Sequence, residues 1–471
     1  MKTKPFIIFL ALILLGCSND NFELPTALMH NQVDIDAGDD AVAVTKYDIQ
    51  NIVSSFGNGS SENQSRSTFY NNYSLSTIYD STGNPAIYVV NYDNNAGFVL
   101  VSATKDYHPI LAYAEIGNYD IMNSRPYGLD MWEQNTVDAV KESASLPADE
   151  KVIHNIEWLR YSPKNNAPIL RGPSHYEYIT DEEYEELKLT YLATINDLNS
   201  QGKTVYPYEK SSWQQVLNTD FISTAEVMAS QVYWTYEDIW QDFATLVYWE
   251  EYSENTTPIT VRSTWTQKEN YNSEFRRLPN GELPFAGCGP IAAGQIMRYF
   301  QHPVKYNWEQ MPLNYATSVT SKFLFDVAES AHAIYGDNTY GGGTSTTIEN
   351  MRKVFTEYGY TADEVKPASP GAMVNSLLAG SPVYIRGDNG SAGHAWVAAG
   401  LHTKSYTMHY DVYNFGGRKS YGYRGTALQK YLTYYYFYFN WGWGHSDGYY
   451  MLDDVADYNK NMKVILNIKP K

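Results

Sequence analysis

Apolar and polar positions recur with different periods along the chain, and each period predicts a different element. Residues 42–56 carry apolar side chains at helical spacing, which predicts a short helix. Residues 86–115 contain β-branched and aromatic runs on both sides of an Asn/Gly-rich turn at 93–97, which predicts an antiparallel hairpin. A helix and a hairpin of this size could fold as one small unit.

The central stretch, residues 125–255, is mainly helical by pattern. Capping-box sequences begin at Thr180 and Ser223, and each predicts the start of a helix. The aromatic run over 233–249 is interpreted as one face of a packed helix and not as a ligand site. A polar break at 253–258 places the start of the last domain there.

Beyond this break the order is helices first and strands afterwards. Helices are predicted from Cys288 onward, over 321–334 and over 347–358. Strands are predicted at 383–385, 395–399, 410–413, 434–440 and 449–451. A helical half followed by an antiparallel half is an α+β layout.

Composition supports a globular protein and removes two classes of function. The 471 residues are 43% hydrophobic, enough for two or three domains with real cores. The net charge of -19, with no basic run, argues against nucleic-acid binding, which needs a basic surface. There is no His-Glu-x-x-His motif, and two distant cysteines form no structural zinc site, so no metal or organic cofactor is expected.

The N-terminus resembles a bacterial lipoprotein signal. A basic start precedes an apolar run over 6–15 that is too short to span a bilayer. The run ends in a lipobox-like sequence at 14–17, in which Cys17 would become the lipidated first residue. The simpler alternative is an ordinary signal peptide with a chance cysteine. We expect an extracytoplasmic protein anchored by Cys17 to a bacterial membrane or cell surface, which would leave Cys288 without a cysteine partner.

Cys288 has the local setting of a nucleophile. Gly287 and Gly289 leave the thiol sterically open, and Pro290 suits the first turn of a helix. A cysteine at a helix N-terminus has its thiolate stabilised by unpaired amides, and its own amide can donate to an oxyanion. The alternative is a small buried core cysteine, and one residue does not decide between the two.

His394 is the candidate base. It follows Gly393 and precedes an apolar strand, so its imidazole is expected at a strand start. Asn440 ends a later strand and could accept from the imidazole, while Trp441 could shield that bond from water and Trp443 would lie in a mobile loop. The alternatives are a structural strand histidine and a glycine-rich turn with core tryptophans.

Gln267 lies 21 residues before Cys288, and its side-chain amide could supply a second oxyanion donor. Two other histidines, His302 and His402, are interpreted as structural.

Residues 261–471 resemble the catalytic domain of the streptopain-type branch of papain-like cysteine peptidases. The resemblance rests on Trp265-x-Gln267, Gly287-Cys288 with its Ala/Gly-rich helix, Gly393-His394-Ala395 and Asn440-Trp441-Gly442-Trp443-Gly444. It implies that Cys288 is the nucleophile, His394 the base and Gln267 an oxyanion donor.

Further roles also come from this resemblance. Either Asn440 or Trp441 orients the histidine, and Gly393 and Trp443 are assigned to substrate binding. The hairpin over 86–115 is similar to the inhibitory propeptide of the branch, which implies that the N-terminal domain covers the catalytic cleft until it is cut away. Residues from about 125 to 255 depart from the family because they are longer and more helical than its linker, so the activation site is undefined.

The expected organisation is a signal peptide at 1–16, a tether at 17–34, an inhibitory prodomain at 35–145, a helical linker at 146–255 and a papain-like catalytic domain at 256–471. The expected function is a monomeric, lipid-anchored cysteine endopeptidase that is made as a zymogen and acts on proteins or peptides. The alternatives are an inactive surface lipoprotein that binds protein or glycan, and a Cys-dependent amidase or transferase. A serine hydrolase is rejected, because the G-x-S-x-G match at 444–448 precedes a predicted strand where that motif requires a helix.

Overall fold

The computed structural model describes residues 42–58, 72–121, 125–146, 151, 154, 157–158, 161, 181–208, 243–337, 343–388, 393–415, 422–452 and 462–471. The predicted signal peptide, lipobox and tether, and the capping box at Ser223, lie outside these residues. None of the helices within the described ranges is long and apolar enough to cross a membrane.

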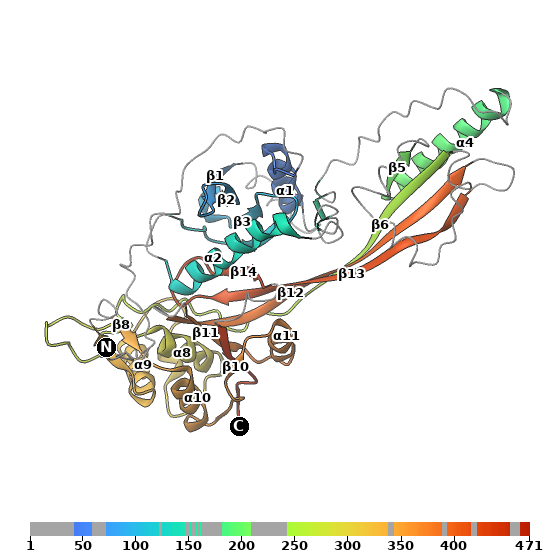
Figure 1. Ribbon diagram of the computed structural model, residues 1–471. Coiled ribbons are helices and arrows are strands. Elements are labelled where there is room, and N and C mark those ends of the chain that lie inside the picture. The colour runs from blue at the N-terminus through green and yellow to red at the C-terminus, as the bar shows by residue number, and fades with distance from the viewer. Residues whose placement is uncertain are drawn as a thin grey trace, which may run out of the picture.

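The N-terminal part is a four-stranded antiparallel sheet with two helices (Figure 1). Its elements are α1 (Lys46–Asn58), β1 (Tyr73–Tyr79), β2 (Pro85–Tyr92), β3 (Phe98–Ser102), β4 (Ile110–Ala114) and α2 (Tyr127–Glu142). The predicted helix is α1, and the predicted hairpin is β2 paired with β3. Gly97 closes the hairpin turn at φ 105°, and a Cβ there would lie 2.1 Å from the carbonyl oxygen of Ala114. Only glycine fits this close approach.

This sheet continues into the C-terminal half of the chain. Ala112 and Tyr113 of β4 pair with Tyr450 and Tyr449 of β14. The strand order is β1-β2-β3-β4-β14-β13-β12-β11-β15-β10. The C-terminal strands are β10 (Lys366–Pro367), β11 (Val383–Asp388), β12 (Gly393–Phe415), β13 (Gly422–Asn440), β14 (Gly448–Met451) and β15 (Met462–Ile465). The N-terminal unit is therefore joined to the rest of the molecule by a strand ladder as well as by side-chain packing.

Each face of β12 packs into a different hydrophobic core. Trp396 and Ala398 lie in the core shared with α2 and the N-terminal sheet. Ala395, Val397 and Ala399 lie in the core of the helical half. This alternation follows from the two-residue period of a strand.

The helical half contains α8 (Cys288–Phe300), α9 (Ser318–Ser330) and α10 (Ile348–Glu357), and a further helix, α11 (Pro370–Leu378), packs on the other core. The three predicted helices are confirmed, with α9 ending earlier than expected, and α11 was not predicted. Short elements complete the described chain: β7 (Ile334–Asp337), β8 (Gly343–Ser345), β9 (Tyr360–Thr361), β16 (Lys469–Pro470) and 3-10 turns at Asp93–Asn95, Ser143–Ser145 and Trp308–Gln310. The mixture of helices and antiparallel sheet agrees with the predicted α+β class.

A long ribbon leaves the body of the molecule (Figure 1). It consists of β12 and β13, of 23 and 19 residues, and β6 (Phe243–Thr256), which pairs with β12. Near its end β5 (Thr204–Tyr208) pairs with β6, and α4 (Asp181–Ser200) packs against β5.

The ribbon corrects two predictions. The described part of the expected aromatic helix, 243–249, is strand, and the expected polar break at 253–258 is still strand as far as Thr256. Both segments are paired residue for residue with β12. Aromatic and β-branched residues fit a pleated surface once a partner strand is present, and that partner is more than 140 residues away in the sequence.

Candidate active site

Cys288 is the first residue of α8, as predicted. Gly287 before it has φ 91°, and a Cβ there would lie 3.0 Å from Cγ2 of Thr344, so the sharp entry into the helix requires glycine. The first amides of a helix have no partner within it, and their partial positive charge favours a thiolate at Cys288 over a thiol. In the full-length chain the residue is 2% exposed.

The sulfur of Cys288 belongs to a disulfide bond in the structure. Cys17 is the only other cysteine in the sequence, and it lies outside the described residues. Since the thiolate is the attacking species, any reaction at Cys288 requires that this bond first be reduced.

His394 is the second residue of β12 and is 3% exposed. Its Nε2 donates a hydrogen bond of 2.9 Å to the main-chain carbonyl of Trp441. A carbonyl can only accept, so Nε2 carries the proton and Nδ1 of the neutral ring is the basic nitrogen. Burial lowers the His394 pKa to about 4, the Trp441 carbonyl raises it in part, and the Arg386 charge lowers it further.

Of the two candidates for orienting His394, Trp441 makes the contact, and it does so through its carbonyl. The Asn440 side chain forms its hydrogen bonds with other residues. Its Oδ1 accepts from Nε2 of Gln295 at 3.0 Å and from the amide of Gly442 at 3.1 Å, and its Nδ2 donates to the carbonyl of Ser263 at 2.6 Å. Asn440 therefore fixes the loop that carries the Trp441 carbonyl.

Two residues of this network were not predicted as functional. Gln295, on α8, donates to Asn440 and accepts from the hydroxyl of Ser263 at 2.9 Å. Asp447 accepts from the Trp441 amide at 2.9 Å; burial raises the pKa of its carboxyl to about 7, and this hydrogen bond lowers it in part. Gln295 lies on the helix that begins at Cys288, and Asp447 follows the loop after Asn440, but only their three-dimensional partners reveal their roles.

The Gln267 segment lies beside the start of α8. The main-chain carbonyl of Gln267 accepts from the amide of Ala286 at 2.9 Å, two residues before Cys288, and Gln267 is buried. Trp265 is fully buried, and its amide donates to Oε1 of Gln295 at 3.3 Å. This arrangement brings Gln267 to the neighbourhood in which a second oxyanion donor is needed.

The two predicted substrate-binding residues also lie near the histidine. The Trp443 ring is half-buried and stands edge-on to the His394 ring, with centroids 6.4 Å apart. Gly393 pairs with Asp388 of β11, and a Cβ there would lie 2.9 Å from Nη2 of Arg386. The close approach of this guanidinium is a structural reason for glycine at 393.

Helix α2 of the N-terminal unit packs directly on His394. A Cβ at Gly128 would lie 2.9 Å from Cδ2 of His394 and 3.0 Å from Cε3 of Trp396. One turn further on, Met131 reaches Gly387 of β11, where a Cβ would lie 2.2 Å from its Cε atom. The N-terminal unit therefore covers the imidazole.

Cys288 and His394 come from elements that pack together, since α8 contacts β12. Their side chains nevertheless have different surroundings. Cys288 lies in the core of the helical half, together with Ala395. The His394 ring contacts Trp441, Trp396 and Gly128 on the side covered by α2.

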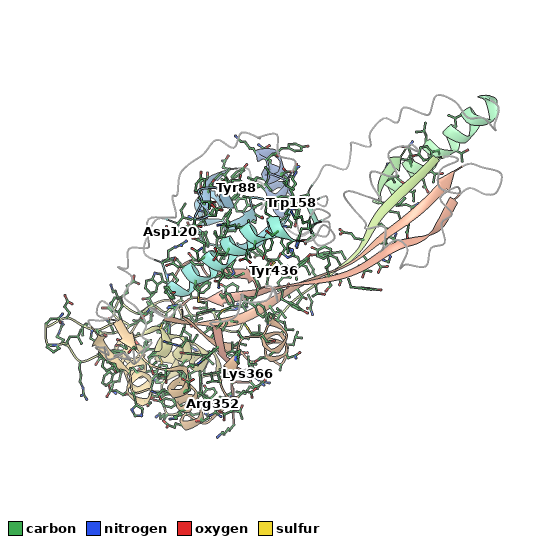
Figure 2. All side chains as sticks on the ribbon, in the orientation of Figure 1. Tyr88, Asp120, Trp158, Arg352, Lys366 and Tyr436 are labelled. Atoms are coloured by element: carbon green, nitrogen blue, oxygen red, sulfur yellow. The ribbon has the colours of Figure 1, made fainter. Side chains whose placement is uncertain are left out.

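His402 lies further along β12 and has other partners. Its Nδ1 is hydrogen-bonded to the hydroxyl of Tyr113 of β4, and its Nε2 lies 3.3 Å from Oε2 of Glu254. Tyr436, labelled in Figure 2, donates from the next strand to the carbonyl of Ile110 at 3.2 Å. These contacts join the two halves of the molecule, which agrees with a structural role for His402.

Comparisons with known proteins match two separate parts of the chain. The family model for the Spi protease inhibitor matches residues 41–140, and the model for the Peptidase C10 family matches residues 265–305. The thiol protease/hemagglutinin PrtT of Porphyromonas gingivalis is 28% identical over 192 residues, covering 32% of this chain and 22% of that protein. The chain thus matches about a fifth of that relative's length.

Two solved structures are also similar. A Prevotella intermedia prointerpain A fragment has 14% identity and a TM-score of 0.40, over 85% of this chain and all of that one. Active interpain A from the same organism has 18% identity and a TM-score of 0.31, over 45% of this chain and 94% of that one. By class, the chain is similar to thiol proteases of the C10 family, with an inhibitor-like segment before the part that matches them.

Proposed function

We propose that the chain is the zymogen of a cysteine endopeptidase that uses Cys288 and His394. The observation that carries the proposal is the hydrogen bond from Nε2 of His394 to the Trp441 carbonyl. It leaves Nδ1 unprotonated, as a base must be, while the N-terminus of α8 favours the Cys288 thiolate. The match of residues 265–305 to the C10 family supports the same chemistry.

In this mechanism the Cys288 thiolate attacks the carbonyl carbon of a peptide bond. The amide of Cys288 and the side chain of Gln267 donate hydrogen bonds to the oxyanion that forms. The imidazolium of His394 then protonates the departing amine and leaves an acyl-enzyme. Nδ1 of His394 next takes a proton from a water molecule whose oxygen attacks the acyl carbon. The C–S bond then breaks, which releases the acid product and regenerates the thiolate and imidazolium.

The N-terminal unit acts as an intramolecular inhibitor. Cys288 and His394 are 2% and 3% exposed with this unit in place, so a peptide substrate has no access to them. Gly128 and Met131 of α2 occupy the space above His394 and Gly387. Cleavage between the two halves would release this cover.

The chain is also proposed to be a lipid-anchored, extracytoplasmic monomer. The support is the lipobox-like sequence at 14–17, and the test is the mass of the N-terminal peptide from membrane fractions. Diacylglyceryl on Cys17, with loss of membrane association in Cys17→Ser, is the expected result. A free N-terminal peptide in the soluble fraction would contradict it. A thioether-linked lipid on Cys17 would leave Cys288 without a cysteine partner, as the sequence predicts.

Casein hydrolysis tests the proposed activity. The reduced wild-type chain should process itself and release peptides from unfolded casein. Cys288→Ala should do neither and should remain full length, while His394→Ala should lose activity by roughly 10³-fold or more. His402→Ala, whose partners are Tyr113 and Glu254, is the matched histidine control and should retain hydrolysis.

Retained hydrolysis in Cys288→Ala would overturn the mechanism. Labelling of Cys288 by a thiol probe without release of peptides would favour an amidase or transferase. If Cys288 is not labelled and no peptides are released, the inactive surface lipoprotein is favoured.

A further inference from the structure

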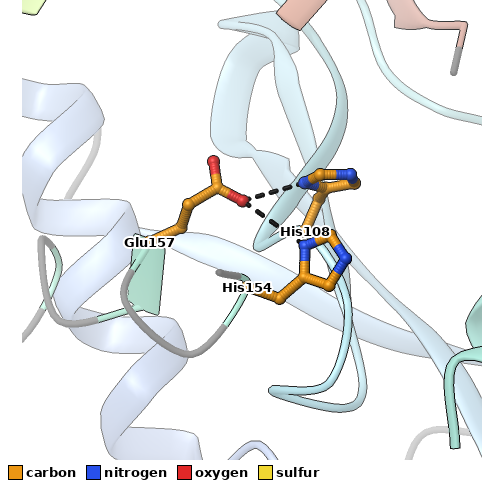
Figure 3. Close-up of side chains that lie close together, drawn as sticks. All are labelled: His108, His154 and Glu157. Carbon is orange, nitrogen blue, oxygen red and sulfur yellow. Dashed lines mark hydrogen bonds and ion pairs between the residues drawn. The ribbon is translucent and has the colours of Figure 1, made fainter. Parts of the chain in front are cut away.

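A cluster of two histidines and a glutamate lies well apart in sequence from the catalytic motifs (Figure 3). His108 lies in the loop between β3 and β4, and His154 and Glu157 lie in the segment that follows α2. Within the described residues, these three are the one group of His, Cys, Asp or Glu side chains whose ligand atoms all lie within 4.8 Å of one another.

The geometry of the cluster is that of a ligand set. Nδ1 of His108 lies 2.8 Å and Nδ1 of His154 3.8 Å from the same oxygen, Oε2 of Glu157. Zinc binds nitrogen and oxygen ligands at about 2.0–2.2 Å, so tetrahedral ligand atoms lie about 3.3 Å apart. The two measured separations lie on either side of that value, and small side-chain rotations would bring the three atoms around one ion.

The cluster is also sheltered from water. The three side chains are 7%, 12% and 10% exposed for His108, His154 and Glu157 respectively. The two imidazole rings stand edge to face with centroids 4.2 Å apart, and the ring of Tyr434, on strand β13, closes over His108 at 4.6 Å. An ion held here would exchange slowly with solvent and would be bordered by the catalytic half of the molecule.

We propose that His108, His154 and Glu157 bind one divalent transition-metal ion, zinc in preference to others, which fastens the segment after α2 to the N-terminal unit. Two imidazole nitrogens and a carboxylate oxygen suit zinc, whereas magnesium and calcium prefer oxygen ligands only. Water would complete the coordination. The sequence pattern did not predict this site, because His108 and Glu157 are 49 residues apart.

The surroundings hold the segment in place independently of an ion. Nε1 of Trp158 donates to the carbonyl of Tyr107 at 2.9 Å, and Nζ of Lys151 donates to Asp106 at 2.8 Å. Variants that lose the metal should therefore still fold. Because Tyr434 of β13 covers His108, the ion should bind best while the two halves are docked, and by linkage it should stabilise the docked form.

Metal binding can be measured without any catalysis. Full-length Cys288→Ala, without a polyhistidine tag, is stripped with a chelator and titrated with zinc chloride, and the bound metal is counted by mass spectrometry. This background removes the thiolate, which is itself a zinc ligand. We expect one zinc per chain and a raised melting temperature. Glu157→Gln and His154→Ala should weaken binding by more than about tenfold, because even loss of an outer-shell partner costs that much.

His332→Asn is the matched control, because His332 is exposed, has φ 50° and lies in another part of the chain, and Asn tolerates that conformation. It should bind zinc as the parent does. Glu157→Gln preserves the shape of the side chain, so an unchanged melting temperature without zinc would show that the fold is retained. The proposal would be overturned if the Cys288→Ala chain bound much less than one zinc ion. It would also be overturned if Glu157→Gln bound zinc as tightly as the parent does.

A second measurement, which rests on the proposed zymogen function, concerns activation. A chelator should speed self-processing of the reduced wild-type chain and leave the rate of Glu157→Gln unchanged. Processed enzyme serves as the control for direct inhibition of Cys288 by zinc. A chelator effect of the same size in Glu157→Gln would contradict a role in activation. Absence of any processing would count against the proposed function and leave the zinc titration to decide the metal site.

Discussion

Burial shifts the pKa values of two groups in opposite directions on either side of the Trp441 main chain. The His394 pKa falls to about 4 and the Asp447 pKa rises to about 7. Both shifts have burial as their largest cause, because burial disfavours the charged form of each group. Between pH 4 and pH 7 both side chains are therefore neutral in the full-length chain. Removal of the cover over His394 should relieve part of this burial and raise the pKa of its imidazole.

Acid should destabilise the full-length chain through His394. The unfolded chain protonates this residue near pH 6.5, and the folded chain only near pH 4. Between these values the unfolded state binds more protons, so stability falls as the pH falls through this window. The melting temperatures of Cys288→Ala and Cys288→Ala/His394→Gln should diverge from pH 7 to pH 4, in favour of the double variant. Parallel curves would show that His394 has no such shift.

At the residue scale, the sequence predicted the two reactive groups, Cys288 and His394. It did not predict the residues that position the loop beside His394. Cys288 and His394 stand in short motifs whose chemistry can be read locally. Gln295 acts on Asn440, 145 residues later, and Asp447 acts on a main-chain amide. Neither side chain differs in local sequence from an ordinary polar residue, so their roles follow only from the fold.

At the scale of elements, helix α2 is the contact that covers the site. Its first turn lies against His394 and Trp396, and the contact is possible because residue 128 has no side chain. A Cβ at Gly128 would come within 3.0 Å of both rings, a spacing that packed side chains do not tolerate without displacement. Gly128 therefore determines how closely the prodomain fits.

Enlarging residue 128 should weaken inhibition. Gly128→Val should cost about 1–3 kcal/mol of docking through overpacking, and Gly128→Ala less. The expected result is self-processing that becomes faster from wild type to Ala to Val, measured by the appearance of the mature band under reducing conditions. Gln134→Ala, on the exposed face of the same helix, should process at the wild-type rate. Equal rates in all four proteins would contradict the contact between α2 and His394.

Elements with local signals were predicted well, and elements that depend on distant partners were not. Helix α8 was predicted from Gly287, Pro290 and helical spacing, and it begins at Cys288. Strands β12 and β13 were predicted only as short segments. Their outer parts contain residues such as Thr403, Lys404 and Ser405, which resemble a loop, but each is paired in the ribbon with β6 and β13.

At the scale of the whole molecule, one sheet runs through both the inhibitor-type domain and the catalytic half. The junction is the pairing of β4 with β14, supported by the hydroxyl of Tyr113 bonded to His402 and that of Tyr436 bonded to Ile110. In the proposed zymogen, inhibition would combine β-augmentation, through the pairing of β4 with β14, with the cover that α2 provides. Release of the prodomain would convert β14 into an edge strand.

Hydrogen exchange should detect this change. In the full-length Cys288→Ala chain, amides of β14 that face β4 should be protected. After cleavage of the linker by an added protease and removal of the prodomain, the same amides should exchange faster, while those of β14 that face β13 stay protected. Equal protection in both forms would show that the β4–β14 ladder does not persist in solution.

If Cys288 and His394 react as a pair, the pH dependence of thiol alkylation will reveal it. The processed, reduced enzyme is treated with iodoacetamide from pH 4 to pH 9, and the modification of Cys288 is timed by mass spectrometry. A paired thiolate should react rapidly with an apparent pKa well below the ordinary value of about 8.5. His394→Ala, cleaved by an added protease because it cannot process itself, should have a pKa closer to that value. An apparent pKa near 8.5 in the wild-type enzyme, unchanged by His394→Ala, would contradict the account.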